Sequence, residues 1–440
     1  MEKNIWLDLG YWIQKKIKSA GADHSALGIN HSRSVSVDYR DGKVEKLKES
    51  TQQGLWIEVF AGGRYSNHST NDLRKPSLEK FIQNAVDMTK FLEVDEFQGL
   101  PDPELYEGQP DVDLDLSDSG FSKLTAEERQ ARARQLGAFV KGKDPRIISI
   151  ASGFYDYHGN NYYLRSNGFE GHSESTSFTQ GVSVSLQGKG DRKPEGWRYY
   201  RARHLEDLPD AETTANEALK RTQDQIGQTK VATATMPMLV ENSNVPGLLW
   251  RLMHPLSGGA IQQKSSFLEG KQDTQIASEA LTLLDDPTIV RGLGSRYFDG
   301  DGIAAHPMPV IEKGVLKNYY VDVYNARKLG WKPTTGGSSN VVIPPGKRSP
   351  AEMEADIERG ILVTNWLGGN ANPTTGDYSL GVAGWLIENG KRTQPISEMN
   401  ISGNFAELLM SLKEIGNDPY PHSSFRSPTM LFEGISFSGS

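Results

Sequence analysis

Residues 24–60 read HSALGINHSRSVSVDYRDGKVEKLKESTQQGLWIEVF. Polar residues alternate with β-branched and aromatic ones, and Asp41-Gly42 is a dipeptide typical of a two-residue hairpin turn. The pattern predicts a meander of four short strands, at 25–30, 33–39, 43–50 and 54–60. An antiparallel sheet is therefore the expected centre of this part of the chain.

Helical patterns flank the meander on both sides. Before it, five apolar residues recur at helical spacing: Ile5, Leu9, Trp12, Ile13 and Ile17. After it, residues 77–92 follow Pro76 and carry the stripe Leu78, Phe81, Ile82, Ala85, Val86 and Met88. We expect a helix–sheet–helix unit within residues 1–100.

Residues 93–124 are rich in Pro, Asp, Gly and Ser, which is typical of a connector. An alternation of acids starts at Asp111 and invites comparison with a calcium loop. Such a loop needs Gly at its sixth position and an acid at its twelfth. Leu116 and Ser122 stand there, so no calcium site is predicted.

The same order of elements returns after the connector. Residues 125–142 are predicted to be helical, with Thr125 and Glu128 spaced as a capping box. Residues 210–226 form a second expected helix, and strands are expected between the two helices, at 146–157, 161–166, 170–187 and 197–204. Residues 115–228 therefore predict a second helix/antiparallel-sheet unit, similar to the first in element order but not in sequence.

Glycine and long strands dominate from residue 231 onward. IEKG at 311–314 and IENG at 387–390 are two similar hairpin tips. The expected helices are few: 245–254, 351–360 and 405–415. The whole chain is thus predicted to be α+β, with two N-terminal helix/antiparallel-sheet units and a mostly β C-terminal domain over 231–440.

Composition excludes several classes of protein. The chain has 440 residues, no cysteine and a net charge of −8, so disulfides and thiolate ligands are excluded and a nucleic-acid partner is disfavoured. Its basic stretch at 129–134 shares a helix with Glu127 and Glu128, which is typical of a solvated face. No apolar run suits a membrane span and no export signal is recognised, so a cytoplasmic protein without membrane contact is expected.

Three segments are candidates for chemistry. The first, VPGLLWRLMHPLSGGAIQQKSSFLEGK at 245–271, is an apolar helix that breaks at Pro255 before a Ser-Gly-Gly turn. No Walker lysine or G-x-G-x-x-G accompanies that turn, so the phosphate-loop signal is weak. The others are PTTGDYSLG at 373–381 and IGND at 415–418. Both are turn-forming sequences, with a peptide-contact role as the alternative.

These segments, in this order, resemble the TldD/PmbA family, also called modulators of DNA gyrase. The matching stretches are SGGAIQQKSSFLEGK, VIEKGVLKNYYVDVYNARKLG, TGDYSLGVAGWLIENG, PISEMNISGN and IGND, and they span most of 231–440. The sequences of these stretches resemble the PmbA (TldE) branch more than the TldD branch. The resemblance implies a cytosolic TldD/TldE complex that degrades unfolded proteins or peptides.

In that family the TldD subunit carries H-E-x-x-x-H on a helix and a cysteine near the C-terminus as zinc ligands. Without gaps from Lys264, the motif falls on Trp250, Arg251 and Pro255, and the cysteine falls near Ser427. An indole, a guanidinium and a pyrrolidine supply neither ligand nor base. The resemblance therefore implies a subunit without metal or cofactor, beside a TldD-like partner that holds the zinc.

The resemblance also suggests residues that would line a substrate cleft: His254, Ser257, Gly258, Gly259, Gly376, Asp377, Tyr378, Asn417 and Asp418. His254 is open to two interpretations, a residual metal or general-base residue and a helix C-terminal histidine. Because the surface that pairs with the sister subunit would otherwise be exposed, we expect a homodimer when the chain is isolated.

Two other functions remain as alternatives: an autonomous metallopeptidase or hydrolase with an unrecognised site, and a gyrase-associated or nucleic-acid regulator. Serine hydrolysis is disfavoured, since Ser436 lies in GISFS within a terminal strand and not in a nucleophile elbow. The aromatic residues at 154–157 and 162–163 could stack bases or bind peptide, but at strand spacing they are more typical of sheet packing.

Overall fold

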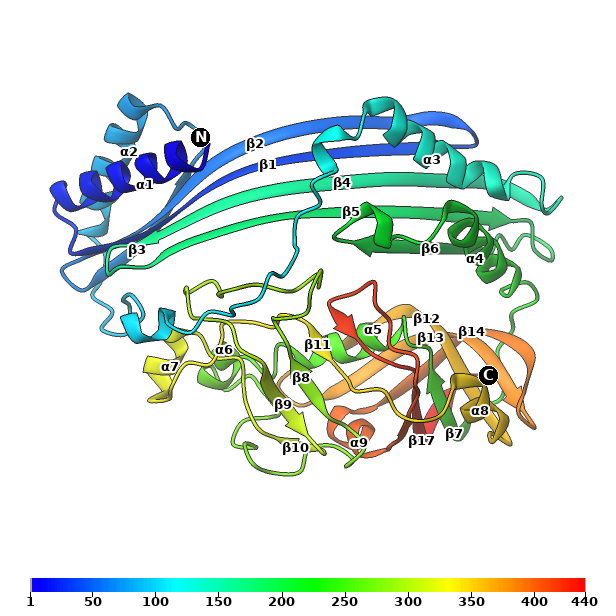
Figure 1. The fold of residues 1–440 in the computed structure, drawn as a ribbon. Coiled ribbons are helices and arrows are strands. Elements are labelled where there is room, and N and C mark those ends of the chain that lie inside the picture. Colours follow the sequence, from blue (N-terminus) through cyan, green and yellow to red (C-terminus); the bar gives the residue numbers. More distant parts are fainter. Residues whose placement is uncertain (1, 440) are drawn as a thin grey trace.

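The computed structural model describes residues 2–439, with side chains from Ile5 onward. A long curved sheet lies beside a second, β-rich body (Figure 1). The sheet begins with two strands of unusual length, β1 (His24–Arg40) and β2 (Lys43–Ala61). Their pairing runs from His24 opposite Phe60 to Arg40 opposite Lys43, with one irregularity near Asp38.

The prediction of four short strands in this region was wrong. Ser32 stays paired with Gln52 in the middle of the β1–β2 ladder, where the sequence turns polar. The ladder is made of backbone groups, so polar side chains on both faces do not interrupt it. The break expected between 157 and 161 is likewise absent, because β4 (Ile147–Arg165) is continuous.

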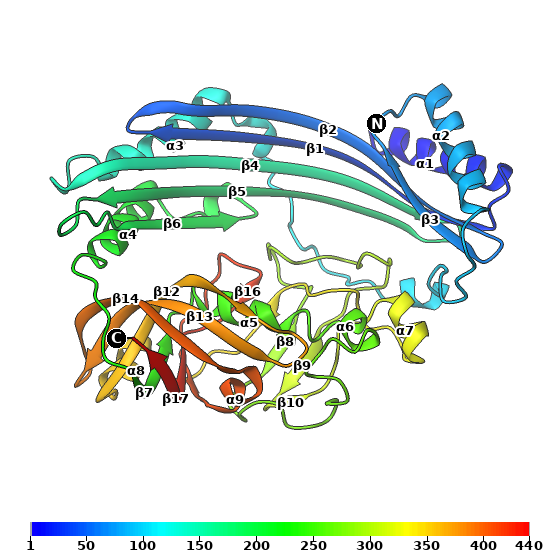
Figure 2. The same ribbon diagram turned by 180° about the vertical axis from the view of Figure 1, so that it is seen from behind.

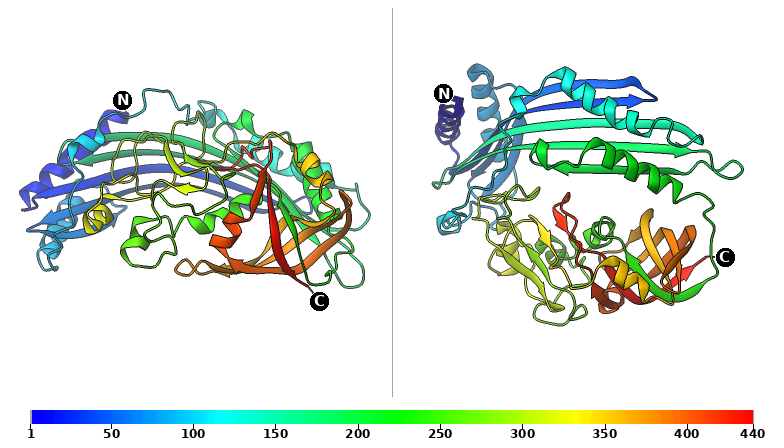
Figure 3. Two further views of the ribbon diagram at one scale, coloured as in Figure 1. Left: turned by 90° about the horizontal axis from the view of Figure 1, so that it is seen from below. Right: turned by 45° about the vertical axis from the view of Figure 1, so that its right-hand side comes forward.

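The first sheet has the order β3-β2-β1-β4-β5-β6. Its remaining strands are β3 (Arg64–Thr70), β5 (Glu170–Leu186) and β6 (Glu195–Ala202). The two N-terminal units are halves of this one sheet, joined where β1 pairs with β4. Two pairs of helices cover opposite ends of one face: α1 (Glu2–Ser19) with α2 (Lys75–Thr89), and α3 (Ala126–Val140) with α4 (Ala211–Gln223) (Figures 1 and 3).

Each helix pair encloses its own core. Ile13 and Ile17 of α1 are buried against Leu27 and Ile29, as the helical spacing predicts, whereas Ile5 is exposed. The capping box of α3 is confirmed, with Glu128 N donating to Thr125 Oγ1 at 3.2 Å and Thr125 N to Glu128 Oε2 at 2.7 Å. Beneath α3, the side chains of Arg129 and Asp156 form a fully buried ion pair.

The connector lies between the sheet and the C-terminal domain and is bonded to both. It holds two short 3₁₀ turns, Pro103–Tyr106 and Phe121–Lys123. The carbonyl of Leu105 accepts from Ala304 N at 2.8 Å, and that of Leu114 accepts from Arg291 N at 2.8 Å. On the other side, Leu116 O accepts from Thr176 N of β5 at 2.9 Å.

The C-terminal domain contains two sheets that share one core (Figure 2). The larger sheet has the order β14-β13-β12-β7-β17-β15 and the smaller β10-β9-β8-β11-β16. The bounds are β7 Ala234–Val240, β8 Leu283–Asp285, β9 Met308–Glu312, β10 Val315–Leu316, β11 Val341–Val342, β12 Arg359–Ala371, β13 Asp377–Glu388, β14 Lys391–Asn404, β15 Leu412–Ile415, β16 Phe425–Arg426 and β17 Met430–Ser438. The α+β class with two sheet-bearing units and a mostly β domain is confirmed.

All three predicted hairpin tips are two-residue turns. Positive φ angles stand at Asp41 and Gly42 (51° and 80°), at Lys313 and Gly314 (46° and 78°), and at Asn389 and Gly390 (50° and 71°). Two consecutive residues with positive φ are the mark of the turn that matches strand twist.

Helix lengths in this domain were predicted less well. The helices are α5 Val245–Leu249, α6 Gly258–Gln262, α7 Val323–Leu329, α8 Pro350–Ala355 and α9 Phe405–Met410, and a 3₁₀ turn spans Trp250–Leu252. The prediction for 405–415 was wrong beyond Met410, because Leu412–Ile415 leaves the helix to pair with β17. Within the described chain, no helix is both long and apolar enough to cross a membrane.

Candidate functional site

Trp250 begins the 3₁₀ turn that follows α5 and is 61% exposed. Its indole packs edge-on against Phe425 of β16, with ring centroids 5.6 Å apart and an interplanar angle of 63°. A large aromatic side chain therefore stands at the surface, where the segment 245–262 meets the loop of residues 416–429. We call this loop the C-terminal loop.

Arg251 and Pro255 are held by contacts within the same region. The Arg251 guanidinium donates to the carbonyl of Gly247, and partial burial lowers the pKa of Arg251. Pro255 is buried, and its carbonyl accepts from Ser266 Oγ at 2.6 Å. An indole, a guanidinium and a pyrrolidine make no donor set for zinc. The side chains at Trp250, Arg251 and Pro255 therefore do not fit the zinc of the H-E-x-x-x-H motif.

His254 lies between them with an exposed side chain. Its backbone carbonyl accepts from Ser257 N at 2.9 Å and from Ser257 Oγ at 2.8 Å, which closes the turn after the helix. In the described part of the chain, no three His, Asp or Glu side chains are grouped so as to hold a metal ion. The structure does not assign a chemical role to His254.

The Ser-Gly-Gly turn is explained by packing. Ser257 caps α6, since its Oγ accepts from Ala260 N at 3.2 Å. A Cβ on Gly258 would lie 2.9 Å from Val321 Cγ1 and 3.2 Å from its Cα, which leaves no room for a side chain. Gly259 is more open, with its nearest neighbour, Asn325 Nδ2, 3.6 Å from such a Cβ.

Gly376, Asp377 and Tyr378 form a second group, at the start of α9. Gly376 has φ 84° and accepts from Phe405 N at 2.8 Å. The Asp377 carboxylate accepts from Thr375 Oγ1 at 2.7 Å and from Asn404 Nδ2 at 3.0 Å, and these bonds lower the pKa of Asp377. Tyr378 is buried against Phe405, and burial raises its pKa to about 12.

Asn417, Asp418 and Ser427 belong to the C-terminal loop. The Asp418 carboxylate accepts from Thr429 N at 3.0 Å and from Thr429 Oγ1 at 2.8 Å, which fixes the base of the loop. Asn417 N donates to Arg348 O at 2.9 Å. Ser427 is buried, and its Oγ donates to the carbonyl of Asn242 at 3.3 Å.

The fold therefore brings some predicted residues together and keeps others apart. Asn242 bridges Ser427 and Asp418, since its Nδ2 also donates to Asp418 O at 2.8 Å. This places the C-terminal loop directly beside the segment that carries Trp250. Gly376 and Asp377 are instead bonded to Phe405 and Asn404 at the start of α9. Their turn also contacts the chain just after α6, where Phe267 N donates to Pro373 O at 2.9 Å.

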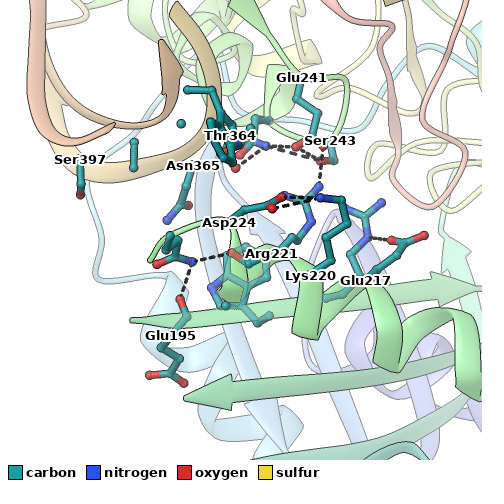
Figure 4. Close-up of a pocket in the computed structure, with 18 of the residues that line it drawn as sticks. Glu195, Glu217, Lys220, Arg221, Asp224, Glu241, Ser243, Thr364, Asn365 and Ser397 are labelled. Atoms are coloured by element: carbon teal, nitrogen blue, oxygen red, sulfur yellow. Dashed lines mark hydrogen bonds and ion pairs between the residues drawn. The ribbon is translucent and has the colours of Figure 1, made fainter. Parts of the chain in front are cut away.

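A cleft of about 410 Å³ lies between the N-terminal sheet and the C-terminal domain. In Figure 4, Lys220 and Arg221 of α4, with Asp224 just after the helix, face Glu241 and Ser243 of the C-terminal domain. None of the residues that line the cleft is among the site residues predicted from the sequence. They include Trp197, Tyr199, Arg221, Glu241, Asn244, Thr364, Asn365, Leu367, Trp385 and Tyr420.

Every lysine and arginine that lines the cleft is paired with an acid. Arg221 Nη2 lies 2.6 Å from Glu241 Oε1, and Lys220 Nζ lies 3.0 Å from Asp224. Glu241 also accepts from Asn244 Nδ2 at 2.8 Å. Arg221 and Glu241 belong to different domains, so the only sequence signal for this wall is the exposed alternation of aromatic residues at Trp197 and Tyr199.

The C-terminal loop reaches the cleft as well. Tyr420 OH donates to the carbonyl of Tyr199 at 3.4 Å, and His422 Nδ1 lies 3.3 Å from the carbonyl of Arg201. Both carbonyls belong to β6, the edge strand of the sheet. One loop thus connects the Trp250 region with the edge of the N-terminal sheet.

Two sheet-bearing units followed by a β-rich domain make a three-part architecture, and models of the domains of a metallopeptidase family match all three parts. Domain 1 of the PmbA/TldA metallopeptidases matches residues 26–89, the central domain 120–226 and the C-terminal domain 233–439. The chain belongs to the PmbA/TldD metallopeptidase family, which confirms the resemblance seen in the sequence.

Individual relatives agree over nearly the full length. The metalloprotease PmbA of Escherichia coli O157:H7 is 28% identical over 428 residues, which are 96% of this chain and 94% of the relative. The PmbA homologue of Haemophilus influenzae is 26% identical over 426 residues, 96% of this chain and 93% of the relative.

Two solved structures share the fold. A proposed modulator of DNA gyrase from Bacteroides thetaiotaomicron is 39% identical with a TM-score of 0.96, covering 98% of each chain. TldE from Thermococcus kodakarensis is 21% identical with a TM-score of 0.87, covering 98% of this chain and 100% of that one, and at this identity it supports the fold alone.

Proposed function

We propose that the protein is the non-catalytic, TldE-like subunit of a cytoplasmic proteolytic complex. It would shape a peptide-binding cleft beside a TldD-like subunit that holds zinc and supplies the attacking water. One observation carries the proposal. The segment that the resemblance aligns with the family's metal-binding helix is folded and packed, and that alignment puts Trp250, Arg251 and Pro255 where the ligands and the base would stand.

Electrostatics support this assignment. A guanidinium keeps its charge under all ordinary conditions, and a like charge about 4 Å from a dication is unfavourable by several kcal/mol at the effective dielectric of a protein surface. Arg251 is also engaged with the carbonyl of Gly247. The segment is thus stabilised as a structural element without metal.

The cleft supports a role in binding peptide. It is bounded on one side by the strand β6, which presents the side chains of Trp197 and Tyr199. Because the backbone carbonyls of Tyr199 and Arg201 already bind the C-terminal loop, a bound chain would contact these side chains and would not extend the sheet. Its other wall offers neutral polar side chains at Thr364 and Asn365. An unfolded substrate has both the extended backbone and the varied side chains that such a cleft accommodates.

The test begins with the purified chain alone. Elemental analysis is expected to find no stoichiometric zinc, and casein is expected to remain uncleaved. Affinity capture from the native lysate, followed by mass spectrometry, is then expected to recover a TldD-like subunit, and casein cleavage is expected once the two are combined. Stoichiometric zinc together with cleavage by the chain alone would overturn the proposal.

The names of the relatives favour one other candidate, an autonomous metallopeptidase, since the E. coli relative is called a metalloprotease. The same experiment separates the two, because only an autonomous enzyme cleaves without a partner. Light scattering on the isolated chain adds a further check. We expect a homodimer at micromolar concentration, in which the surface that would bind the TldD-like subunit binds a second copy of this chain. A monomer would contradict this expectation.

A further inference from the structure

The helix-free face of the N-terminal sheet carries a group of flat aromatic rings. Along each strand, side chains alternate between the two faces. Tyr155, Tyr157, Trp197 and Tyr199 therefore point away from the face that α3 and α4 cover, and we call these four residues the aromatic platform. Figure 2 views the sheet from this side, with the helices behind the strands.

Glycines under the rings let the tyrosines lie against the sheet. A Cβ on Gly159 would stand 2.8 Å from Cε1 and 2.9 Å from Cζ of Tyr157. A Cβ on Gly181, which pairs directly with Tyr199, would stand 2.8 Å from Tyr199 Cγ and nearer still to two other ring carbons. Any other residue at these positions would push the rings away from the sheet.

The platform is exposed but connected to the cleft. Tyr157 is 39% exposed, Tyr199 43% and Trp197 51%. Trp197 and Tyr199, whose ring centroids lie 6.0 Å apart, also line the cleft between the domains. Tyr155 is fixed in place, since its hydroxyl donates to Asp38. The platform thus continues the wall of the cleft onto the open sheet.

The opposite end of the same face shows what covers such rings. There the C-terminal domain places Phe298 edge-on against Tyr163, at 5.5 Å and 79°, and against Phe169, at 5.1 Å and 79°. Phe298 sits over Gly171, where a Cβ would lie 2.6 Å from its ring. At this end of the sheet, a phenylalanine from another segment of the polypeptide therefore packs on Tyr163 and Gly171.

We propose that the aromatic platform binds aromatic side chains of an extended polypeptide that enters through the cleft. A cleft of about 410 Å³ has the size of a small-ligand pocket, so it can admit a segment of a single extended chain but not a folded partner. Nucleic acid is disfavoured in the cleft, since the lysines and arginines that line it are paired with acids. Arg201, on the same face as the platform, donates to Ser177 Oγ, so a single-stranded oligonucleotide is included in the test. The inference rests on the proposed function only in taking polypeptide as the ligand.

The test uses the intact chain without zinc or partner. Fluorescence anisotropy would follow a labelled, neutral, unstructured peptide of about a dozen residues with two phenylalanines, next to the same peptide with alanines. The phenylalanine peptide is expected to bind about tenfold more tightly or better. Trp197→Ser and Tyr199→Ser are each expected to weaken its binding about fivefold or more.

Two further variants separate recognition from folding. Gly181→Ala keeps all four aromatic residues but displaces the Tyr199 ring, and it is expected to weaken binding while the thermal unfolding curve stays cooperative. Phe91→Ser removes an aromatic side chain that is 89% exposed on another part of the surface, and it is expected to leave binding unchanged.

Three outcomes would overturn the proposal. They are equal binding of the two peptides, no loss in the Trp197 and Tyr199 variants, and a labelled oligo-dT binding more tightly than the peptide with losses in the same variants. Failure of the proposed function looks different. In that case the chain alone cleaves casein, whatever its affinities for the peptides. If the chain does not cleave casein and binds the two peptides equally, only the proposal for the aromatic platform fails.

Discussion

The N-terminal sheet and the C-terminal domain satisfy their backbone hydrogen-bonding groups in different ways. In the sheet, β1, β2, β4 and β5 are 17 to 19 residues long and pair with one another almost without interruption. In the smaller C-terminal sheet, strands of two to five residues alternate with irregular segments. Buried polar side chains supply the missing partners there.

Asp299 is an example from the second region. It is 6% exposed, and its carboxylate accepts from Asp301 N at 2.9 Å, from Ile303 N at 3.0 Å and from Gly336 N at 2.9 Å. A strand spreads its stability over many equivalent bonds, whereas this loop depends on one residue. Single polar substitutions should therefore matter more in the C-terminal domain than in the sheet.

The largest expected effect is the exception to that rule, the buried pair of Arg129 and Asp156. Arg129→Met leaves an unpaired carboxylate under α3, and we expect a loss of about 3–5 kcal/mol in the free energy of unfolding. Burial raises the pKa of Asp156 above its ordinary value. The loss in this variant should therefore shrink as the pH falls and Asp156 is protonated.

Urea unfolding at neutral and mildly acidic pH measures this difference. Arg134→Met is the matched control, because Arg134 is an exposed residue of the same helix, and it should change stability by less than about 0.5 kcal/mol. Equal losses in the two variants would show that the helix, and not the buried pair, is responsible.

The second expected effect compares the regions directly. Asp299→Ala removes the acceptor of three backbone N–H groups, of which that of Ile303 is buried, and we expect a loss of about 2–3 kcal/mol. Ser34→Ala, in the middle of β1, should cost less than about 0.5 kcal/mol, because the ladder bonds there are made by the backbone. Similar losses in the two variants would remove the proposed distinction.

The same distinction explains which elements could be predicted from the sequence. Alternation and turn dipeptides locate the sheet, and the Asp41-Gly42, Lys313-Gly314 and Asn389-Gly390 turns are all where they were expected. The continuity of β1 through Ser32 could not be seen, because its polar middle has the composition of a loop. Likewise, nothing local marks 412–415 as a strand, since its pairing with β17 is a tertiary contact.

The candidate site divides in the same way. Local residue chemistry predicts that Trp250, Arg251 and Pro255 offer no metal donors, and the Ser257 cap follows from its sequence. That Asn242 joins Asp418 to Ser427, or that Arg221 meets Glu241, depends on contacts between distant segments. Only the folded chain brings those residues together.

The third expected effect uses two glycines at the same position of the same kind of turn. Gly42, with φ 80°, has open space around an added Cβ, whereas one on Gly390, with φ 71°, would lie 2.5 Å from Ala355 O. Gly42→Ala should cost about 1 kcal/mol from backbone strain alone. Gly390→Ala should cost about 2 kcal/mol or more, because α8 must also move.

Thermal unfolding of the two variants gives the comparison without a further control, since each serves as the reference for the other. A larger loss for Gly42→Ala would mean that the open end of the β1–β2 hairpin contributes more than its exposure suggests.

The smallest expected effect concerns the contact that joins the two regions. Arg291 of the C-terminal domain donates to Asp115 Oδ2 of the connector at 2.6 Å and to Glu206 Oε1 at 2.7 Å. The hydrogen bond from Arg291 lowers the pKa of Asp115. A carboxylate with a lowered pKa in the folded state stabilises that state above its unfolded pKa, and the contribution is lost as the pH falls through the folded value.

Arg291→Gln should therefore lower the urea midpoint slightly at neutral pH and make it less sensitive to acid. The two chains should become more similar as the pH falls below the ordinary aspartate value. Arg359→Gln, at an exposed arginine of β12, controls for the loss of one positive charge and should keep the acid sensitivity of the parent. Because the contact is partly open to solvent, added salt should weaken the difference between the variants. A salt-independent difference would instead mean that backbone hydrogen bonds, such as that from Arg291 N to Leu114 O, hold the connector in place. The junction would then be stabilised by backbone groups, as the N-terminal sheet is, and not by charged side chains.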